Sequence, residues 1–239
     1  MLVSYQPVLV LLSIGVAILG SLTALALTAF SDAEDAGGGQ RGVALISGGL
    51  IMGATIWSMH FVAMMAVDFP VVVNYNLMET VGSIAIAIVA TGAGLYLASS
   101  RLVGRLSIPL GGVLVGLGIA GMHYLGMTAI RGCGLNYSYG LVSASIGIAV
   151  GASMAALWFA FYKRTVLMTA VGGIVQGLAI ASMHYTAMAA TYFVPLGPDV
   201  MISAPIFSQA KMAYVIAAGI LIISVVNLTM VALMSRENA

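Results

Sequence analysis

Charged side chains are scarce in this chain. Lys, Arg, Asp and Glu together make up 6% of the 239 residues, whereas 62% are hydrophobic, and the mean hydropathy is +1.12. About a quarter of the residues of a soluble globular domain are normally charged. The composition therefore excludes a soluble domain and predicts an integral membrane protein. The formal net charge of +1 gives no reason to expect a nucleic-acid partner.

Other absences narrow the function. No Asp, Glu, Lys or Arg lies deep in an apolar run, where ion paths and proton relays place charged groups. Lys211 precedes the last run, so that run has no central lysine for a retinal Schiff base. No nucleophile–base pair, phosphate-binding loop or carboxylate dyad is present, so we expect this chain not to be an enzyme. The single cysteine, Cys133, excludes an internal disulfide.

The long apolar runs predict membrane-spanning helices. About 20 residues cross the hydrocarbon of a bilayer as a helix, and the runs lack the alternation of barrel strands. We therefore expect an all-α bundle of seven transmembrane helices that forms a single domain over residues 1–239. The predicted spans are residues 8–30, 43–66, 78–99, 109–129, 139–162, 166–191 and 212–234.

The only three histidines lie in three copies of one motif. The copies read Met59-His60-Phe61-Val62-Ala63-Met64, Met122-His123-Tyr124-Leu125-Gly126-Met127 and Met183-His184-Tyr185-Thr186-Ala187-Met188. Spacings of 63 and 61 residues indicate an internal repeat. Each histidine helix would start a two-helix repeat, which leaves one extra helix. All three histidines fall at a similar depth, so we expect them to meet in one polar pocket near the outer surface.

Glycines recur upstream of each histidine, eleven and seven residues before it. Because these positions share a helix face with the histidine and with the methionine four residues after it, the histidines are predicted to face the bundle. Glycines four residues apart let helices approach closely. The predicted packing positions are Gly49, Gly53, Gly112, Gly116, Gly173 and Gly177.

Basic residues between the spans predict the orientation. Six lie on one side and two, Arg131 and Lys211, on the other. The positive-inside rule then predicts an extracytoplasmic N-terminus and a cytoplasmic C-terminus. The six predicted cytoplasmic residues are Arg41, Arg101, Arg105, Lys163, Arg164 and Arg236.

The repeated motif resembles the signature of the bacterial MHYT domain. Met183-His184-Tyr185-Thr186 matches it in full, and Met59-His60-Phe61-Val62 and Met122-His123-Tyr124-Leu125 look like variant copies. The resemblance covers nearly the whole chain. It implies a sensory module of the bacterial cytoplasmic membrane, often joined to GGDEF and EAL domains that make and degrade cyclic di-GMP. It also implies copper binding and the sensing of oxygen, carbon monoxide or nitric oxide.

The side chains themselves favour copper. Imidazole suits copper, zinc and iron, and thioether sulfur suits Cu(I). We expect a copper site, Cu(I) or Cu(II), with zinc as the alternative. Haem fits less well because a glycine-packed bundle leaves little room for a porphyrin. The expected ligands are His60, His123 and His184 with Met64, Met127 and Met188; Met59, Met122 and Met183 are further candidates.

Alternatives remain open at this stage. The module would sense a gas, redox state or copper itself, and it could pair as a homodimer. A metal or small-molecule transporter would need polar residues that continue inward, and a structural bundle would use its histidines only for hydrogen bonds. Asp68 or Glu79 could orient a histidine, although solvated loop charges are the simpler interpretation. Gln176 is expected to hydrogen-bond between helices.

Overall fold

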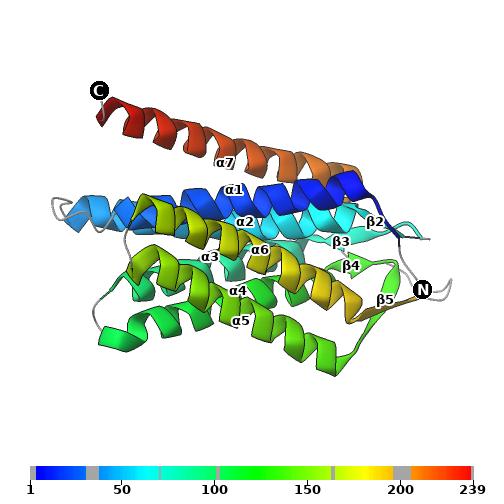
Figure 1. Cartoon of the computed structure of the whole chain (residues 1–239). Coiled ribbons are helices and arrows are strands. Elements are labelled where there is room, and N and C mark those ends of the chain that lie inside the picture. The colour runs from blue at the N-terminus through cyan, green and yellow to red at the C-terminus, as the bar shows by residue number, and fades with distance from the viewer. Residues whose placement is uncertain are drawn as a thin grey trace.

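A computed structural model describes residues 4–30, 38–69, 71–100, 103–162, 165–195 and 206–237. Seven long helices dominate it (Figure 1). The helices are α1 (Pro7–Phe30), α2 (Gly38–Met65), α3 (Leu77–Ser99), α4 (Ser107–Thr128), α5 (Tyr139–Tyr162), α6 (Val166–Ala189) and α7 (Gln209–Glu237). A single 3-10 turn, Gly104–Leu106, precedes α4.

The helix bounds agree with the spans predicted from the sequence to within a few residues. Six helices, α1 to α6, are long and apolar enough to cross a membrane. They confirm an all-α, multi-pass architecture. The seventh span is not confirmed, because the apolar part of α7 whose side chains are described, Lys211–Ile223, is shorter than a membrane crossing.

The first six helices form a closed ring in chain order. Each helix packs against the next, and α1 packs against α6 to complete the circle. The three histidine helices, α2, α4 and α6, also contact one another, as do the three flanking helices, α1, α3 and α5. Helix α7 lies outside this ring, against α2 and α1 (Figure 1).

Glycines set the distance between each histidine helix and one flanking helix. A Cβ atom added at Gly53, Gly116 or Gly177 would lie 2.6, 2.5 and 2.5 Å from the Cα atoms of Ile88, Val150 and Ile18, respectively. The backbones touch there, so only glycine fits without a shift. The same holds one turn earlier, where Gly49, Gly112 and Gly173 face Gly92, Met154 and Leu22.

These contacts reveal a pseudo-threefold arrangement that corrects the predicted pairing. Helix α2 meets α3 and α4 meets α5 through equivalent glycines, but α6 meets α1 and not α7. The third two-helix unit therefore joins the sixth helix to the first. The extra helix is α7, whereas pairing each histidine helix with the helix that follows it would leave the first helix unpaired.

Short strands cover one end of the ring. They are β1 (Ser4–Tyr5), β2 (Val67–Asp68), β3 (Asn74–Asn76), β4 (Ile130–Arg131), β5 (Cys133–Tyr137), β6 (Thr191–Pro195) and β7 (Ile206–Ser208). All pairings are antiparallel: β1 with β2, β3 with both β4 and β7, and β5 with β6. Each strand before a flanking helix thus pairs with a strand after a histidine helix.

Three equivalent backbone hydrogen bonds anchor this strand end. The amides of Gln6, Asn76 and Ser138, at the starts of the flanking helices, donate to the carbonyls of Ala66, Ala129 and Ala190, each at 2.8 Å. Each of these alanines lies six residues after a histidine. The side chain of Asn76 also caps α3 by accepting from the Met78 amide at 2.8 Å. The end of each histidine helix is therefore tied at an equivalent place to the start of one flanking helix.

Candidate metal centre

The three histidines lie at one level of the bundle. His60, His123 and His184 each stand five residues before the last residue of their helix, about 7.5 Å from the strand end at 1.5 Å per residue. All three side chains are fully buried. They converge as the sequence predicted, and none of the three side chains is exposed to solvent.

The Nδ1 atoms of the three rings form a nearly equilateral triangle. Each of the three Nδ1–Nδ1 distances is 3.1 Å. The rings meet edge to face, with centroids 4.9 to 5.1 Å apart. These atoms form the one cluster of potential metal-binding side chains found within the described part of the chain.

Hydrogen bonds alone do not satisfy this triangle. A neutral imidazole has one N–H and one lone-pair nitrogen. A proton on one Nδ1 can bridge to one neighbour, so at least one pair of nitrogens would face each other as lone pairs or as two N–H groups. A cation shared by three Nδ1 lone pairs removes this conflict. The arrangement therefore fits a metal ion better than it fits a hydrogen-bonded core.

The size of the triangle is also compatible with a metal ion. An equilateral triangle with 3.1 Å sides has its centre about 1.8 Å from each corner, and metal–imidazole bonds of zinc are about 2.0 to 2.1 Å. Small outward shifts of the rings would bring the two values together. Three neutral histidines suit copper and zinc alike.

Six methionines from the motifs accompany the histidines in the core. Each methionine four residues after a histidine lies one turn nearer the strand end on the same helix face. Each preceding methionine lies about 100° round the helix. All six are buried; they are Met64, Met127, Met188, Met59, Met122 and Met183. Burial is compatible with ligation and with core packing, so their role stays a prediction.

The opposite nitrogens of the rings have a different environment. The three Nε2 atoms are buried, and among the described residues none of them has a hydrogen-bond partner. The His60 ring lies close to Gly126, where an added Cβ would be 2.7 Å from Nε2. The equivalent positions after the other two histidines are Ala187 and Ala63. Gly126 thus gives the His60 ring the space it occupies.

The acidic residues considered as partners of the histidines bind elsewhere. Asp68 accepts hydrogen bonds from Ser4 and from Gln6 at the strand end, both at 3.1 Å. Glu79 forms an ion pair with Arg131 at 2.6 Å. Neither carboxylate therefore orients an imidazole.

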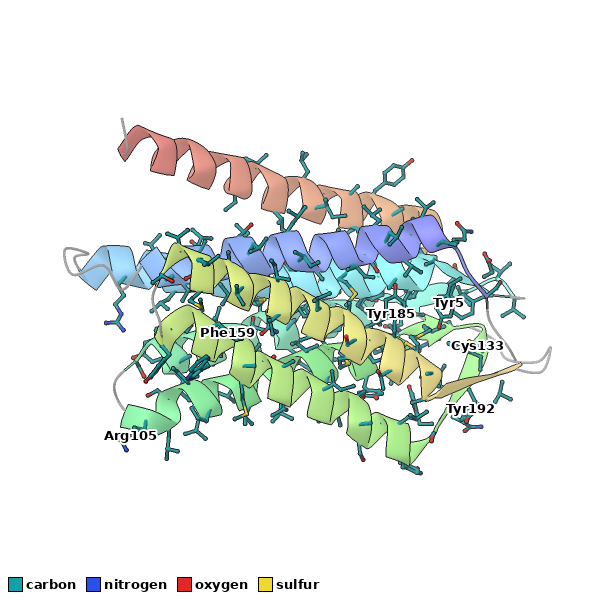
Figure 2. All side chains as sticks on the ribbon, viewed as in Figure 1. Tyr5, Arg105, Cys133, Phe159, Tyr185 and Tyr192 are labelled. Carbon is teal, nitrogen blue, oxygen red and sulfur yellow. The ribbon has the colours of Figure 1, made fainter. Side chains whose placement is uncertain are left out.

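Two other polar residues lie away from the histidine triangle. Gln176 donates from Nε2 to Ser153 Oγ on the neighbouring helix at 3.0 Å, which confirms the predicted interhelical bond. Cys133 is a buried free thiol on β5, and burial raises its pKa. Figure 2 places Cys133 beside the strands, at the opposite end of the bundle from Arg105.

The sequence analysis did not predict two tyrosine–serine hydrogen bonds, one beside His123 and one beside His184. Tyr124 and Tyr185 each follow a histidine, and their hydroxyls meet Ser145 and Ser13 on the next flanking helix at 2.7 and 2.8 Å. A signal for these partners was present, because a serine stands eight residues after Tyr5, Tyr75 and Tyr137. In that repeat the tyrosine precedes each of the three flanking helices and the serine lies in the first turns of the helix.

Comparison with known proteins places this arrangement in a family. Two segments, residues 53–111 and 116–173, match the MHYT family, described as "Bacterial signalling protein N terminal repeat". No solved structure matches the chain.

Curated relatives are signalling proteins. The chain is 42% identical over 200 residues to the bifunctional diguanylate cyclase/cyclic di-GMP phosphodiesterase MucR of Pseudomonas aeruginosa, covering 81% of this chain and 29% of MucR. It is 35% identical over 204 residues to the signalling protein YkoW of Bacillus subtilis, covering 82% of this chain and 25% of YkoW. It is 35% identical over 211 residues to the cyclic di-GMP phosphodiesterase NbdA of P. aeruginosa, covering 84% and 26%.

The chain thus spans about a quarter of the length of these relatives. It corresponds to one region of each of them. The two family matches include His60 and His123, one in each segment, and end before His184. This chain belongs to the MHYT family of bacterial membrane signalling proteins.

Proposed function

We propose that the chain is a sensory membrane module that binds one copper ion between its three histidine helices. The observation that carries the proposal is the buried triangle of Nδ1 atoms, 3.1 Å on each side. The ligands are His60, His123 and His184, supported by the methionines that follow them by four residues. Soft sulfur beside imidazole favours copper over zinc.

Copper in this position would connect three helices that are far apart in sequence. When bound, it would supply a centre that binds a diatomic gas, changes redox state or reports copper itself. The histidine helices hold the three nitrogens, and the apolar core around them excludes water. Helix α7 packs on α2, so a shift of α2 on ligand binding would reach α7. The names of the relatives support cyclic di-GMP turnover as the controlled activity.

We further propose that the histidine end lies outside the cytoplasmic membrane. The strand end carries Arg131, whereas Arg41 and Arg105 lie toward the other end; Arg101, Lys163 and Arg164 lie outside the described residues, as does the side chain of Arg236. A reporter active only in the cytoplasm should work when fused after Ala239. Activity of an export-dependent reporter at that place would reverse the orientation.

The direct test is the metal content of the purified protein. The parent should carry about one copper per chain, and variants with each histidine replaced by alanine should lose it. Met64→Leu, Met127→Leu and Met188→Leu should weaken Cu(I) binding, whereas Met78→Leu should not, because Met78 is 74% exposed. Unchanged copper in a variant that lacks all three histidines would refute the site. Stoichiometric zinc in its place would refute the choice of metal.

A further inference from the structure

The tyrosine after each of two histidines forms the end of a short hydrogen-bond chain. Ser145 Oγ donates to the Val142 carbonyl at 2.8 Å, and Ser13 Oγ donates to the Val10 carbonyl at 2.7 Å. A serine hydroxyl has one proton, so the hydroxyls of Tyr124 and Tyr185 must be the donors to these serines. Each tyrosine hydroxyl is thus bonded to a serine of a flanking helix.

The first copy of the motif lacks this hydrogen bond. Ser83 occupies the equivalent place in α3 and donates to the Thr80 carbonyl at 2.8 Å, as the other two serines do to theirs. The residue after His60, however, is Phe61, which has no hydroxyl to donate. Its ring packs against Trp57 and Tyr75, with centroids 4.7 and 5.4 Å away. Trp57 links α2 to α3 in its own way, by donating to the Thr80 carbonyl at 3.3 Å.

The tyrosine ring also packs against a strand residue in each case. Tyr185 meets Tyr5 with centroids 6.1 Å apart (Figure 2), and Tyr124 meets Tyr137 at 5.7 Å. Phe61 and Tyr75 form the third such pair. The aromatic packing is therefore common to all three copies, whereas the hydroxyl bond occurs in two. The molecule contains its own comparison between a copy with the bond and a copy without it.

A hydrogen bond from a tyrosine to a neighbouring helix restricts the rotation of the tyrosine's own helix about its axis. Consecutive side chains are about 100° apart on a helix, so a tyrosine held against its flanking helix fixes the direction of the preceding histidine. An imidazole nitrogen lies about 6 Å from the helix axis, so a rotation of about 10° would move it by about 1 Å. Ligands of a working site must be held within about 0.5 Å.

We propose that the pairs Tyr124–Ser145 and Tyr185–Ser13 are positioning devices that aim His123 and His184 at the metal. His60 is held without such a bond, by packing around Phe61 and Trp57. The proposal rests on the metal function inferred above. It assigns to the tyrosine of the motif a role as an anchor and not as a ligand. It also assigns a role to two serines outside the motif.

The test is the Cu(I) affinity of purified variants, measured by competition with a chromogenic Cu(I) chelator. Ser13→Ala and Ser145→Ala should each weaken Cu(I) binding about three- to tenfold, as the net loss of one hydrogen bond implies. Ser83→Ala is the matched control and should change the affinity less than about twofold. Ser13→Thr and Ser145→Thr keep a hydroxyl and should restore most of the affinity.

A double substitution separates positioning from general loss of structure. Tyr185→Phe should weaken Cu(I) binding as Ser13→Ala does, and the double variant should be no weaker than either single one, since both remove the same bond. Equal affinities in Ser13→Ala, Ser145→Ala, Ser83→Ala and the parent would overturn the positioning role while leaving the copper site intact. A parent that binds no Cu(I) would instead refute the proposed function itself.

Discussion

The histidine helices meet different neighbours at two levels. At the glycine level, two turns below the histidines, each of them touches the backbone of a flanking helix. At the histidine level the same three helices meet one another through their imidazoles, 3.1 Å apart. The glycine level fixes where each helix stands, and the histidine level uses that placement.

This difference matters because the two levels lie on one helix face by sequence spacing. Glycine seven residues before a histidine is about 20° away from it around the helix. Two residues on one helix face are expected to contact the same neighbouring helix. In α4, however, Gly116 lies against Val150 of α5, whereas His123 lies against His60 of α2 and His184 of α6. Shared burial of a helix face therefore does not identify the helix that covers it.

Enlarging a glycine should have the largest effect. In Gly116→Leu the new side chain would begin 2.5 Å from the Val150 Cα atom, so α4 and α5 must separate. We expect a loss of about 1 to 3 kcal/mol or more of stability, and loss of copper, because His123 moves with α4. Membrane insertion should persist because it depends on hydrophobicity. Copper content and membrane yield measure the two effects.

Gly151→Leu provides the control for this change. Gly151 is an exposed position of α5 with no atom within 4 Å of an added Cβ, so its enlargement should change neither quantity. Normal copper in Gly116→Leu, Gly53→Leu and Gly177→Leu would mean that the glycine level does not organise the histidine level.

A smaller change at the histidine level should act more selectively. Gly126→Ala places a methyl group 2.7 Å from Nε2 of His60. The imidazole must turn, so we expect copper affinity to fall about tenfold with little loss of thermal stability. Gly121→Ala on the same helix is the control, since its methyl group would meet only Ile86, at 3.3 Å. Equal copper affinity in the two variants would contradict the role of Gly126.

The smallest effect is expected at Cys133. Burial raises the pKa of its thiol, so the thiol remains protonated at neutral pH and alkylation should be slower than for an unfolded cysteine. Cys133→Ser should leave copper content within about twofold of the parent, because the proposed ligands are histidines and methionines. Rapid alkylation that copper blocks would instead place Cys133 at the metal.

Much of this architecture could be predicted from the sequence. The spans follow from hydrophobic length, and the convergence of His60, His123 and His184 follows from equal depth in repeated helices. The depth argument succeeds because each histidine lies five residues before the end of its helix, so the three side chains reach the same level of the bundle. The sequence could not predict that the Nδ1 atoms, and not the Nε2 atoms, meet at the centre. The orientation of each imidazole ring depends on local packing, such as the space that Gly126 leaves beside His60.

The closure of the ring could not be predicted from the histidine motif. That motif marks α2, α4 and α6 but does not say whether α6 pairs with α7 or with α1. The second repeat, a serine eight residues after Tyr5, Tyr75 and Tyr137, marks α1, α3 and α5 as equivalent. Leu25, Leu95 and Leu157, each 20 residues after one of those tyrosines, are likewise fully buried. A search for repeats among the flanking helices would have identified α7 as the extra helix.

X-ray absorption of the copper-loaded protein tests the central claim most directly. The histidine triangle predicts three nitrogen ligands at about 2.0 Å from imidazole rings, with any sulfur as an additional ligand. Each of His60→Ala, His123→Ala and His184→Ala should reduce the number of nitrogen ligands or abolish binding. A copper spectrum without imidazole scattering, or one that none of the three substitutions changes, would contradict a metal centre between the three helices.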